Sequence, residues 1–246
     1  MDAPYALLPG QRASASGRLR LDYFAVIKLA FPFMLNSAVQ AVLNATDTWF
    51  VGRLSPAATS VMGAVYWPVL VCILLFGGIA LCVQTLVAHA YGARRYARAS
   101  QATWTALWGA LLTLPLFAVL AATGRTLFSP FGLPPATLDL AVAYWFPRML
   151  GAPLGIALYA VLGFFNGIGR PTITLRVTLV VAIANALFNQ LFIFGLGLGV
   201  AGSAWATGAA QLAGLAMAFA WFFSPANRRR YRSHLTSRFA AVPLLR

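Results

Sequence analysis

Long apolar runs alternate with short polar turns along most of this chain of 246 residues. Each run is close to or above the roughly 20 residues that a helix needs to span a bilayer. We expect helices at 23–52, 61–89, 99–122, 141–168, 175–194 and 201–223. The turns between them carry residues that end helices, such as Ser55-Pro56 and Gly169-Arg170-Pro171. The pattern predicts an all-α integral membrane protein, a bundle of six transmembrane helices.

A polar stripe interrupts the first apolar run. Asn36, Gln40, Asn44 and Asp47 recur every three or four residues, so they fall on one face of a helix with 3.6 residues per turn. Acids within membrane helices are rare, and they usually face a cavity or a partner. Near the start of the run, Pro32 removes a backbone hydrogen bond, and we expect the helix to bend there. Asp47 is therefore the first candidate functional residue.

The composition agrees with a membrane protein. The chain is 61% hydrophobic and 9% charged, whereas soluble domains carry about 25% charged residues. Its formal net charge is +14, but the basic residues form short clusters beside the apolar runs, as expected near a membrane surface. We therefore expect the lipid bilayer, and no nucleic acid, as a partner. The chain has no Glu, and Asp47 is the one acid well inside an apolar run.

The basic residues also predict the orientation of the helices. If the six runs cross the membrane in alternating directions, 15 of the 18 Lys and Arg residues fall on one side. The other three are Arg53, Arg125 and Arg148. Since basic residues favour the cytoplasmic side, we expect a multi-pass protein of the cell inner (plasma) membrane with both termini in the cytoplasm. Residues 1–22 and 224–246 would then be basic tails around a membrane domain at 23–223.

Several polar residues of other runs fall at the depth of Asp47. With a rise of 1.5 Å per residue, Asn185, Asn189 and Thr207 lie in the same outer half of the membrane, and Tyr144 lies near the outer end of its run. We expect these four residues, with Asn44 and Asp47, to line an outward-facing polar pocket. The alternative is that the Asn and Thr side chains only hold helices together. Asp47 could likewise be structural if it formed an ion pair with Arg148.

No catalytic constellation is recognisable in the sequence. Cys72 and Cys82 are ten residues apart in one run, which places them about 15 Å apart on a helix, too far for a disulfide. The single Lys28 has no phosphate-binding glycine loop beside it, and the acids do not cluster. We expect no enzymatic activity, no cofactor and no metal centre.

The sequence resembles the multidrug and toxic compound extrusion (MATE) transporters from about residue 23 to 223. Four stretches carry the resemblance: AFPFMLNSAVQAVLNATDTWFVGRL, QTLVAHAYGARRYARA, GFFNGIGRPTITL and NALFNQLFIFGLGLGVAGSAWAT. Within the family the chain looks closest to the DinF-like branch. The resemblance implies that Asp47 takes the place of the cation-coupling acid in the amino-terminal lobe. It also implies that Asn185, Asn189, Thr207 and Tyr144 match that lobe's polar network.

The chain departs from the family pattern in two ways. DinF-like relatives often have a second Asp where this chain has Asn189, so coupling would depend on one carboxylate. The family has twelve helices in two six-helix lobes, and this chain resembles the amino-terminal lobe only. Its segment 224–246 resembles the linker between the lobes.

The resemblance implies a cation-coupled antiporter that exports drugs or other amphipathic cationic compounds. A proton is the expected coupling ion, because withdrawal from water favours the neutral form of a carboxyl group. Na⁺ is the alternative, since Asn and Thr oxygens could complete its ligand shell. Alternating access by rocking needs a second six-helix lobe, from another chain or from a missing half. A second interpretation is a flippase for a lipid-linked precursor, which is disfavoured because Arg148 is the only cationic candidate for the cavity. A third is an inactive half-length fragment.

Overall fold

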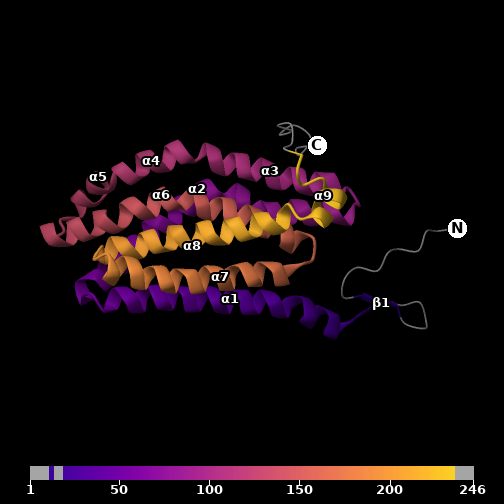
Figure 1. Cartoon of the computed structure of the whole chain (residues 1–246), viewed down its shortest axis with the longest axis horizontal. Coiled ribbons are helices and arrows are strands. Elements are labelled where there is room, and N and C mark those ends of the chain that lie inside the picture. The colour runs from indigo at the N-terminus through magenta and orange to yellow at the C-terminus, as the bar shows by residue number, and fades with distance from the viewer. Residues whose placement is uncertain (1–10, 14–18, 236–246) are drawn as a thin grey trace.

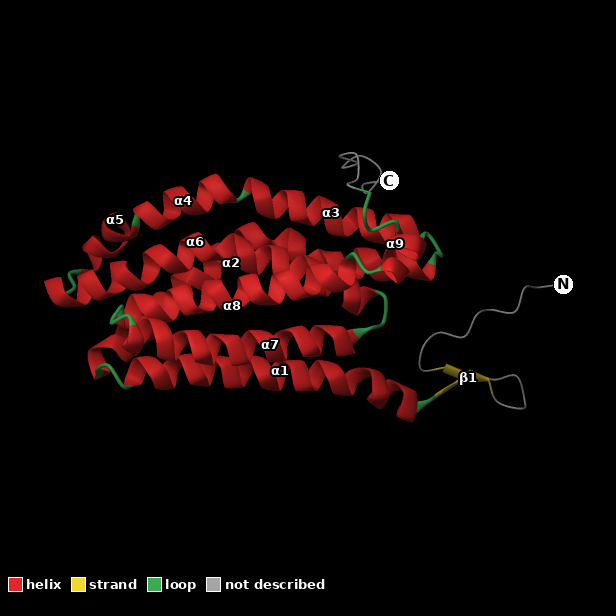
Figure 2. Cartoon of the chain, in the orientation of Figure 1, coloured by secondary structure: helices red, strands yellow, loops and turns green. Residues whose placement is uncertain are grey.

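The computed structural model describes residues 11–13 and 19–235; the rest of the two expected tails, residues 1–10, 14–18 and 236–246, lies outside the described residues. The elements are β1 (Gln11–Ala13), β2 (Leu19–Leu21), α1 (Tyr23–Gly52), α2 (Pro56–Gly92), α3 (Tyr96–Leu112), α4 (Leu114–Ala122), α5 (Gly124–Phe128), η1 (Ser129–Phe131), α6 (Pro135–Gly167), α7 (Pro171–Asn189), η2 (Gln190–Gly195), α8 (Gly199–Phe222) and α9 (Pro225–Tyr231). The strands form a short antiparallel hairpin. All other elements of the described part are helical (Figure 2).

The long helices lie side by side along the long axis of the molecule (Figure 1). Helix α6 is central, because it packs extensively on both α2 and α8. Helix α8 also packs on α7, and α7 packs on α1. Helix α3 packs on α2. Helices α1 and α2 share a much smaller contact, although a short turn joins them. This weak contact leaves room for a cavity between α1 and α2.

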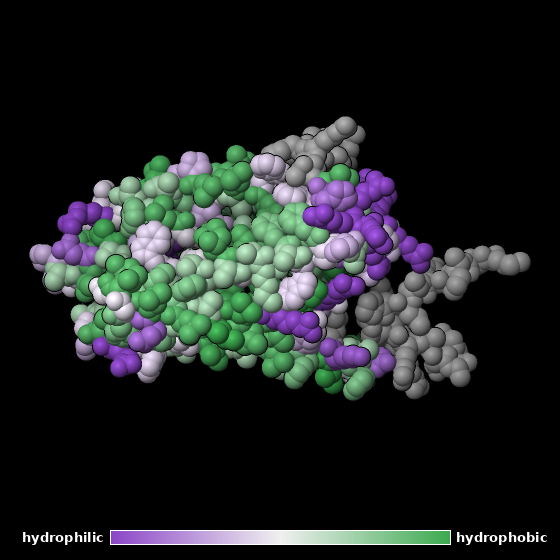
Figure 3. Space-filling view, in the orientation of Figure 1, coloured by the Kyte–Doolittle hydropathy of each residue, from purple (hydrophilic) through white to green (hydrophobic). Residues whose placement is uncertain are grey.

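The lengths of the helices confirm the predicted membrane fold. Five helical stretches are long and apolar enough to cross a membrane. Helices α8 and α9, which are bent by 64° relative to each other, give a sixth if they are counted as one span. Figure 3 shows an apolar middle region with hydrophilic residues gathered near the two ends. Exposed apolar side chains of the long helices include Met34, Leu75 and Leu112. The chain is therefore a multi-pass membrane protein.

The expected helix at 99–122 is interrupted in the structure. Helix α3 ends at Leu112 and α4 begins at Leu114, with Pro115 in its first turn. Proline has no N–H to bond to the carbonyl group four residues earlier, and the Thr113 hydroxyl donates to the Ala110 carbonyl at 2.7 Å. The apolar pattern continues across the break, so hydropathy alone did not reveal it.

Helices α2 and α6 begin five and six residues earlier than the apolar pattern predicted, the largest differences among the helix starts. Helix α2 starts at Pro56 instead of residue 61, because the Ser55 hydroxyl accepts a hydrogen bond from the Ala58 amide at 3.0 Å and caps the first turn. Helix α6 starts at Pro135 instead of residue 141. Both first turns contain polar or small residues that a hydropathy pattern assigns to a turn.

Close helix packing depends on small residues. Between α6 and α8, a Cβ added to Gly151 would lie 3.3 Å from the Gly208 Cα. Between α6 and α2, a Cβ on Gly167 would lie 2.7 Å from the Gln84 carbonyl oxygen. Such contacts let helix backbones approach closely within a membrane. They hold α2, α6 and α8 close together on one side of the cavity.

Candidate functional site

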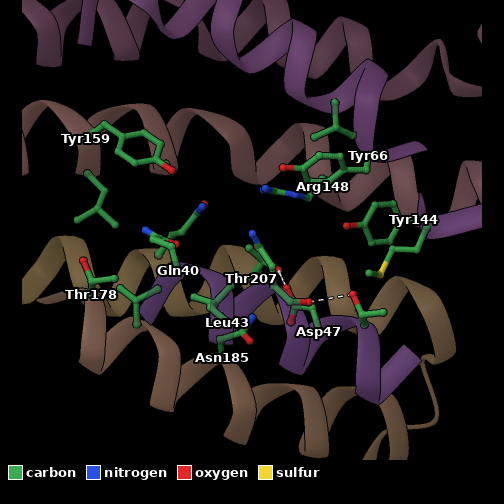
Figure 4. Close-up of a pocket in the computed structure, with 18 of the residues that line it drawn as sticks. Gln40, Leu43, Asp47, Tyr66, Tyr144, Arg148, Tyr159, Thr178, Asn185 and Thr207 are labelled. Carbon is green, nitrogen blue, oxygen red and sulfur yellow. Dashed lines mark hydrogen bonds between the residues drawn. The ribbon is translucent and has the colours of Figure 1, made fainter. Parts of the chain in front are cut away.

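A cavity of about 390 Å³ lies among five helices. Figure 4 shows side chains that point into it from opposite sides. Its polar and aromatic lining comes from α1 (Gln40, Asn44, Asp47, Thr48), α2 (Tyr66, Trp67), α6 (Tyr144, Arg148, Tyr159), α7 (Thr178, Asn185) and α8 (Thr207, Gln211). The cavity thus combines polar and aromatic side chains with aliphatic ones inside an apolar bundle.

Asp47 is held by hydrogen bonds from two other helices. The Asn189 Nδ2 group donates to Asp47 Oδ1 at 2.6 Å and also to Asn185 Oδ1 at 3.1 Å. The Thr207 hydroxyl lies 3.5 Å from Asp47 Oδ2 and 3.0 Å from the Ser203 carbonyl oxygen. A hydroxyl has one proton to donate, so its shorter bond to Ser203 makes it the weaker partner of Asp47. The strong contact of the carboxylate is therefore with Asn189.

The asparagine pair retains unused hydrogen-bonding capacity. Asn185 and Asn189 are fully buried, yet Asn185 Nδ2 and Asn189 Oδ1 have no hydrogen-bond partner. A buried polar group without a partner is costly. The Asn189 oxygen can accept a hydrogen bond from water or from a protonated Asp47, or it can coordinate a cation, whereas the Asn185 nitrogen can only donate, for example to a water molecule.

Arg148 faces the same cavity from α6. Figure 4 shows it across the open space from Asp47, beside Tyr66. It interacts electrostatically with Asp47 and lies next to Tyr144. Within the described part of the chain, the recorded salt bridge joins the exposed Arg125 and Asp139, and Asp47 has no ion pair with Arg148. The cavity therefore holds one negative and one positive group that are not paired.

The structure brings together the residues that the sequence placed at one depth. Asp47, Asn44, Asn185, Thr207 and Tyr144 line the cavity, and Asn189 lies behind Asp47 through its hydrogen bond. Pro32 lies inside α1, which is assigned as one continuous helix, so the bend there stays a prediction. The roles of these residues also stay predictions.

Some lining residues were not predicted to belong to the site. Tyr66 and Trp67 line the cavity, whereas the sequence could not distinguish cavity walls from residues at the membrane interface. Gln211 also lines the cavity, and its Oε1 has no partner among the described residues. No periodic signal marks Tyr159, since α6 is largely buried all round.

A smaller cavity of about 110 Å³ continues from the first and shares Gln40, Tyr159 and Thr178 with it. Asn166 spans its wall, donating to Gln84 Oε1 at 3.3 Å and accepting from the Thr174 hydroxyl at 2.7 Å. These bonds join α2, α6 and α7. The polar stripe of α1 thus follows two connected cavities.

Comparisons with known proteins agree with this architecture. The profile of the MatE family matches residues 32–191. A probable multidrug resistance protein NorM from Mesorhizobium japonicum is 32% identical over 231 residues, 87% of this chain and 47% of that protein. The chain therefore spans about half the length of the curated relatives it matches.

Two solved structures share the fold. A MATE protein in complex with MaD5 has a TM-score of 0.75 and 23% sequence identity, covering 89% of this chain and 50% of that one. The outward-facing conformation of a multidrug resistance MATE family transporter has a TM-score of 0.73 and 23% identity, covering 89% and 49%. At these identities the similarity shows the fold alone.

Proposed function

This chain belongs to the MatE family, and we propose that it is the amino-terminal six-helix part of a cation-coupled antiporter that exports amphipathic cationic compounds. One observation carries the proposal: Asp47 is held by Asn189 on the wall of a cavity inside the membrane bundle. The cavity volume of about 390 Å³ falls within the range of about 300–1,000 Å³ that is usual for small-molecule sites. The NorM relatives, which are named multidrug resistance proteins, support the class of cargo.

The lining of the cavity suits an amphipathic cation. Tyr66, Trp67, Tyr144 and Tyr159 provide aromatic faces, which attract cations and cover apolar groups. Asp47 provides the negative charge. A flippase for an anionic lipid-linked precursor fits less well, because Arg148 is the one cationic side chain among the described residues that line this cavity.

A proton and a cationic compound compete for the negative charge of Asp47, and this competition is the basis of their exchange. A proton on Asp47 removes the charge that attracts a cationic compound, and the new O–H needs an acceptor. Asn189 Oδ1 lies buried next to the carboxylate without a partner, and a turn of its amide lets it accept that hydrogen bond. Proton binding thus changes both the charge and the hydrogen bonds of the site, which gives two states to be coupled to transport.

Separate observations support the branch of the family, the coupling ion, the membrane location and the partner lobe. The resemblance of the first and fifth helices supports the DinF-like branch and the amino-terminal position. Asp47 is the one carboxylate among the described residues that line the cavity, which favours a proton over Na⁺, because Na⁺ prefers a richer set of oxygen ligands. The distribution of basic residues supports the inner membrane with cytoplasmic termini. The length of the relatives supports a second six-helix lobe as partner.

The test is Asp47→Asn in the chain produced together with its second lobe. Asparagine mimics the neutral carboxyl group, so we expect folding to persist and proton-driven efflux to be lost. Asp139→Asn is the control, because Asp139 is an exposed acid in a surface ion pair. Normal efflux by the Asp47→Asn variant under a pH gradient would contradict the proposal. Efflux that follows a Na⁺ gradient and ignores pH would keep the site and replace the coupling ion.

A further inference from the structure

A dense group of arginines covers one end of the bundle. It joins the turn between α2 and α3 to helix α9, and Figure 3 shows the hydrophilic surface gathered there. We call this surface the arginine patch; its members are Arg94, Arg95, Arg98, Arg228, Arg229 and Arg232. All six are exposed, and neither 92–98 nor 225–235 contains an acidic residue. The positive charge is therefore not neutralised within these segments.

A seventh arginine, Arg230, contacts residues in both halves of the patch. The Arg230 guanidinium carbon lies 4.8 Å from the Tyr96 ring centre, 5.7 Å from that of Tyr91 and 5.6 Å from that of Tyr231. Tyr91 and Tyr96 flank the α2–α3 turn, while Tyr231 ends α9. Cation–π contacts of this kind are attractive. Arg230 thus fastens α9 beside the turn that carries Arg94 and Arg95.

Hydrogen bonds fix the far end of α9 as well. The Ser233 hydroxyl donates to the Phe222 carbonyl at 2.7 Å, and the Trp104 Nε1–H donates to the Ser233 carbonyl at 3.0 Å. Asn227 Nδ2 donates to the Trp221 carbonyl at 2.8 Å. Asn227 and Ser233 are buried, whereas the arginines between them remain exposed. The helix therefore presents its charges from a fixed position.

Two arginines of the patch have a strained backbone conformation. Arg94 has φ of 57° and Arg232 has φ of 54°, and they are the two non-glycine residues with positive φ in the described part of the chain. Glycine adopts this conformation readily, whereas other L-residues are strained there. Both positions nevertheless hold an arginine of the same patch.

We propose that the arginine patch binds the phosphate groups of anionic lipids in the adjacent leaflet. Guanidinium groups match phosphate oxygens with two parallel hydrogen bonds. The patch lies beside the apolar surface of the spanning helices, and α9 turns away from α8 by 64°, so lipid headgroups are the phosphates within reach. This inference does not depend on the transport activity proposed above.

The experiment measures lipid binding to the purified full chain in detergent by native mass spectrometry. Phosphatidylglycerol is compared with zwitterionic phosphatidylcholine of the same acyl chains. The test variant Arg95→Gln/Arg229→Gln removes one charge from each half of the patch. We expect phosphatidylglycerol affinity to fall about fivefold for each arginine removed, as for basic residues beside an anionic membrane, with phosphatidylcholine binding unchanged.

The matched control is Arg53→Gln/Arg125→Gln, which removes the same charge outside the patch. It should keep the affinity for phosphatidylglycerol. Arg230→Lys keeps the charge but loses the planar group that contacts three rings, so a smaller loss of affinity is expected if α9 must be held in place. Helical content measured by circular dichroism shows that each variant is folded.

Three results would overturn the proposal. One is equal binding of the two lipids, and another is equal loss in the test and control variants. The third is strong binding of a short oligonucleotide that phosphatidylglycerol does not displace, because the patch would then be a nucleic-acid surface.

Discussion

Asn189 is the residue on which the geometry of Asp47 most depends. Its amide nitrogen donates to both Asp47 and Asn185, and it is fully buried on α7. Hydrogen bonds to charged groups contribute about 1.5–3 kcal/mol, more than bonds between neutral groups. By comparison, the Thr207 hydroxyl has its shorter contact with a backbone carbonyl group. Asn189 therefore links α1 to α7 at the level of the carboxylate.

We predict that Asn189→Leu lowers the free energy of unfolding by about 2 kcal/mol, because it leaves a half-buried carboxylate without its main donor. Asn44→Leu is the control, since Asn44 is exposed on the cavity wall and a change of less than about 0.5 kcal/mol is expected for such positions. Reversible unfolding in mixed micelles provides the measurement.

The pairing itself can be isolated with a double-mutant cycle. If the loss comes from the bond to Asp47, Asn189→Leu should cost much less in an Asp47→Asn background. An equal cost in both backgrounds would mean that Asn189 stabilises the bundle in another way, for example through Asn185.

At the scale of the elements, α8 depends on a close approach to the end of α7. That end continues as the π-helix η2, and the amide of Leu196, the residue after η2, donates to the Leu191 carbonyl at 2.8 Å. A Cβ added to Gly202 of α8 would lie 2.8 Å from the carbonyl carbon of Phe192 and 2.9 Å from its oxygen. Backbone atoms cannot move aside as a flexible side chain can, so this position requires glycine.

We predict that Gly202→Ala destabilises the protein by about 1–3 kcal/mol, the usual cost of overpacking. Gly109→Ala is the matched control, because Gly109 lies in α3 with nothing within 4 Å of its added Cβ. Alanine is favoured over glycine in a helix, so the control should be neutral or slightly more stable. Melting temperatures in detergent would distinguish the two variants, and equal values would contradict the proposed contact.

The sequence predicted the helices better than their interruptions. The first run was predicted with the observed bounds of α1, because an apolar stretch with capping residues has clear ends. The break at Thr113 and the π-helix after Asn189 were missed. Apolar residues continue across both, so only local hydrogen bonding and contacts with other helices distinguish them from regular helix.

At the scale of the whole molecule, the depth of polar residues was predictable but their neighbours were not. The rise of a helix placed Asp47, Asn189 and Thr207 at one level, and they are hydrogen-bonded or adjacent in the structure. Which helices lie side by side could not be derived, since lipid-facing and buried sides of a membrane helix are both apolar. Hence Tyr66 and Trp67, which line the cavity, could not be assigned to it from the sequence.

The topology leads to the last prediction. Arg94 and Arg230 lie at one end of the bundle, where Arg230 contacts the rings on either side of the α2–α3 turn. Arg53 lies at the other end, over the Trp49 and Phe194 rings. The sequence predicts that 15 of the 18 basic residues lie on the side of Arg94, so that end should face the cytoplasm.

Single cysteines test this in cells, after Cys72 and Cys82 are replaced by alanine. Ala57→Cys, in the exposed first turn of α2, should react with a membrane-impermeant maleimide added from outside. Ala93→Cys and Ala226→Cys, exposed at the opposite end, should react only after the membrane is opened. The three sites share exposure and differ only in the end of the bundle, so accessibility within the protein cannot explain a difference between them. The reverse pattern would invert the topology, and it would place the arginine patch in the outer leaflet.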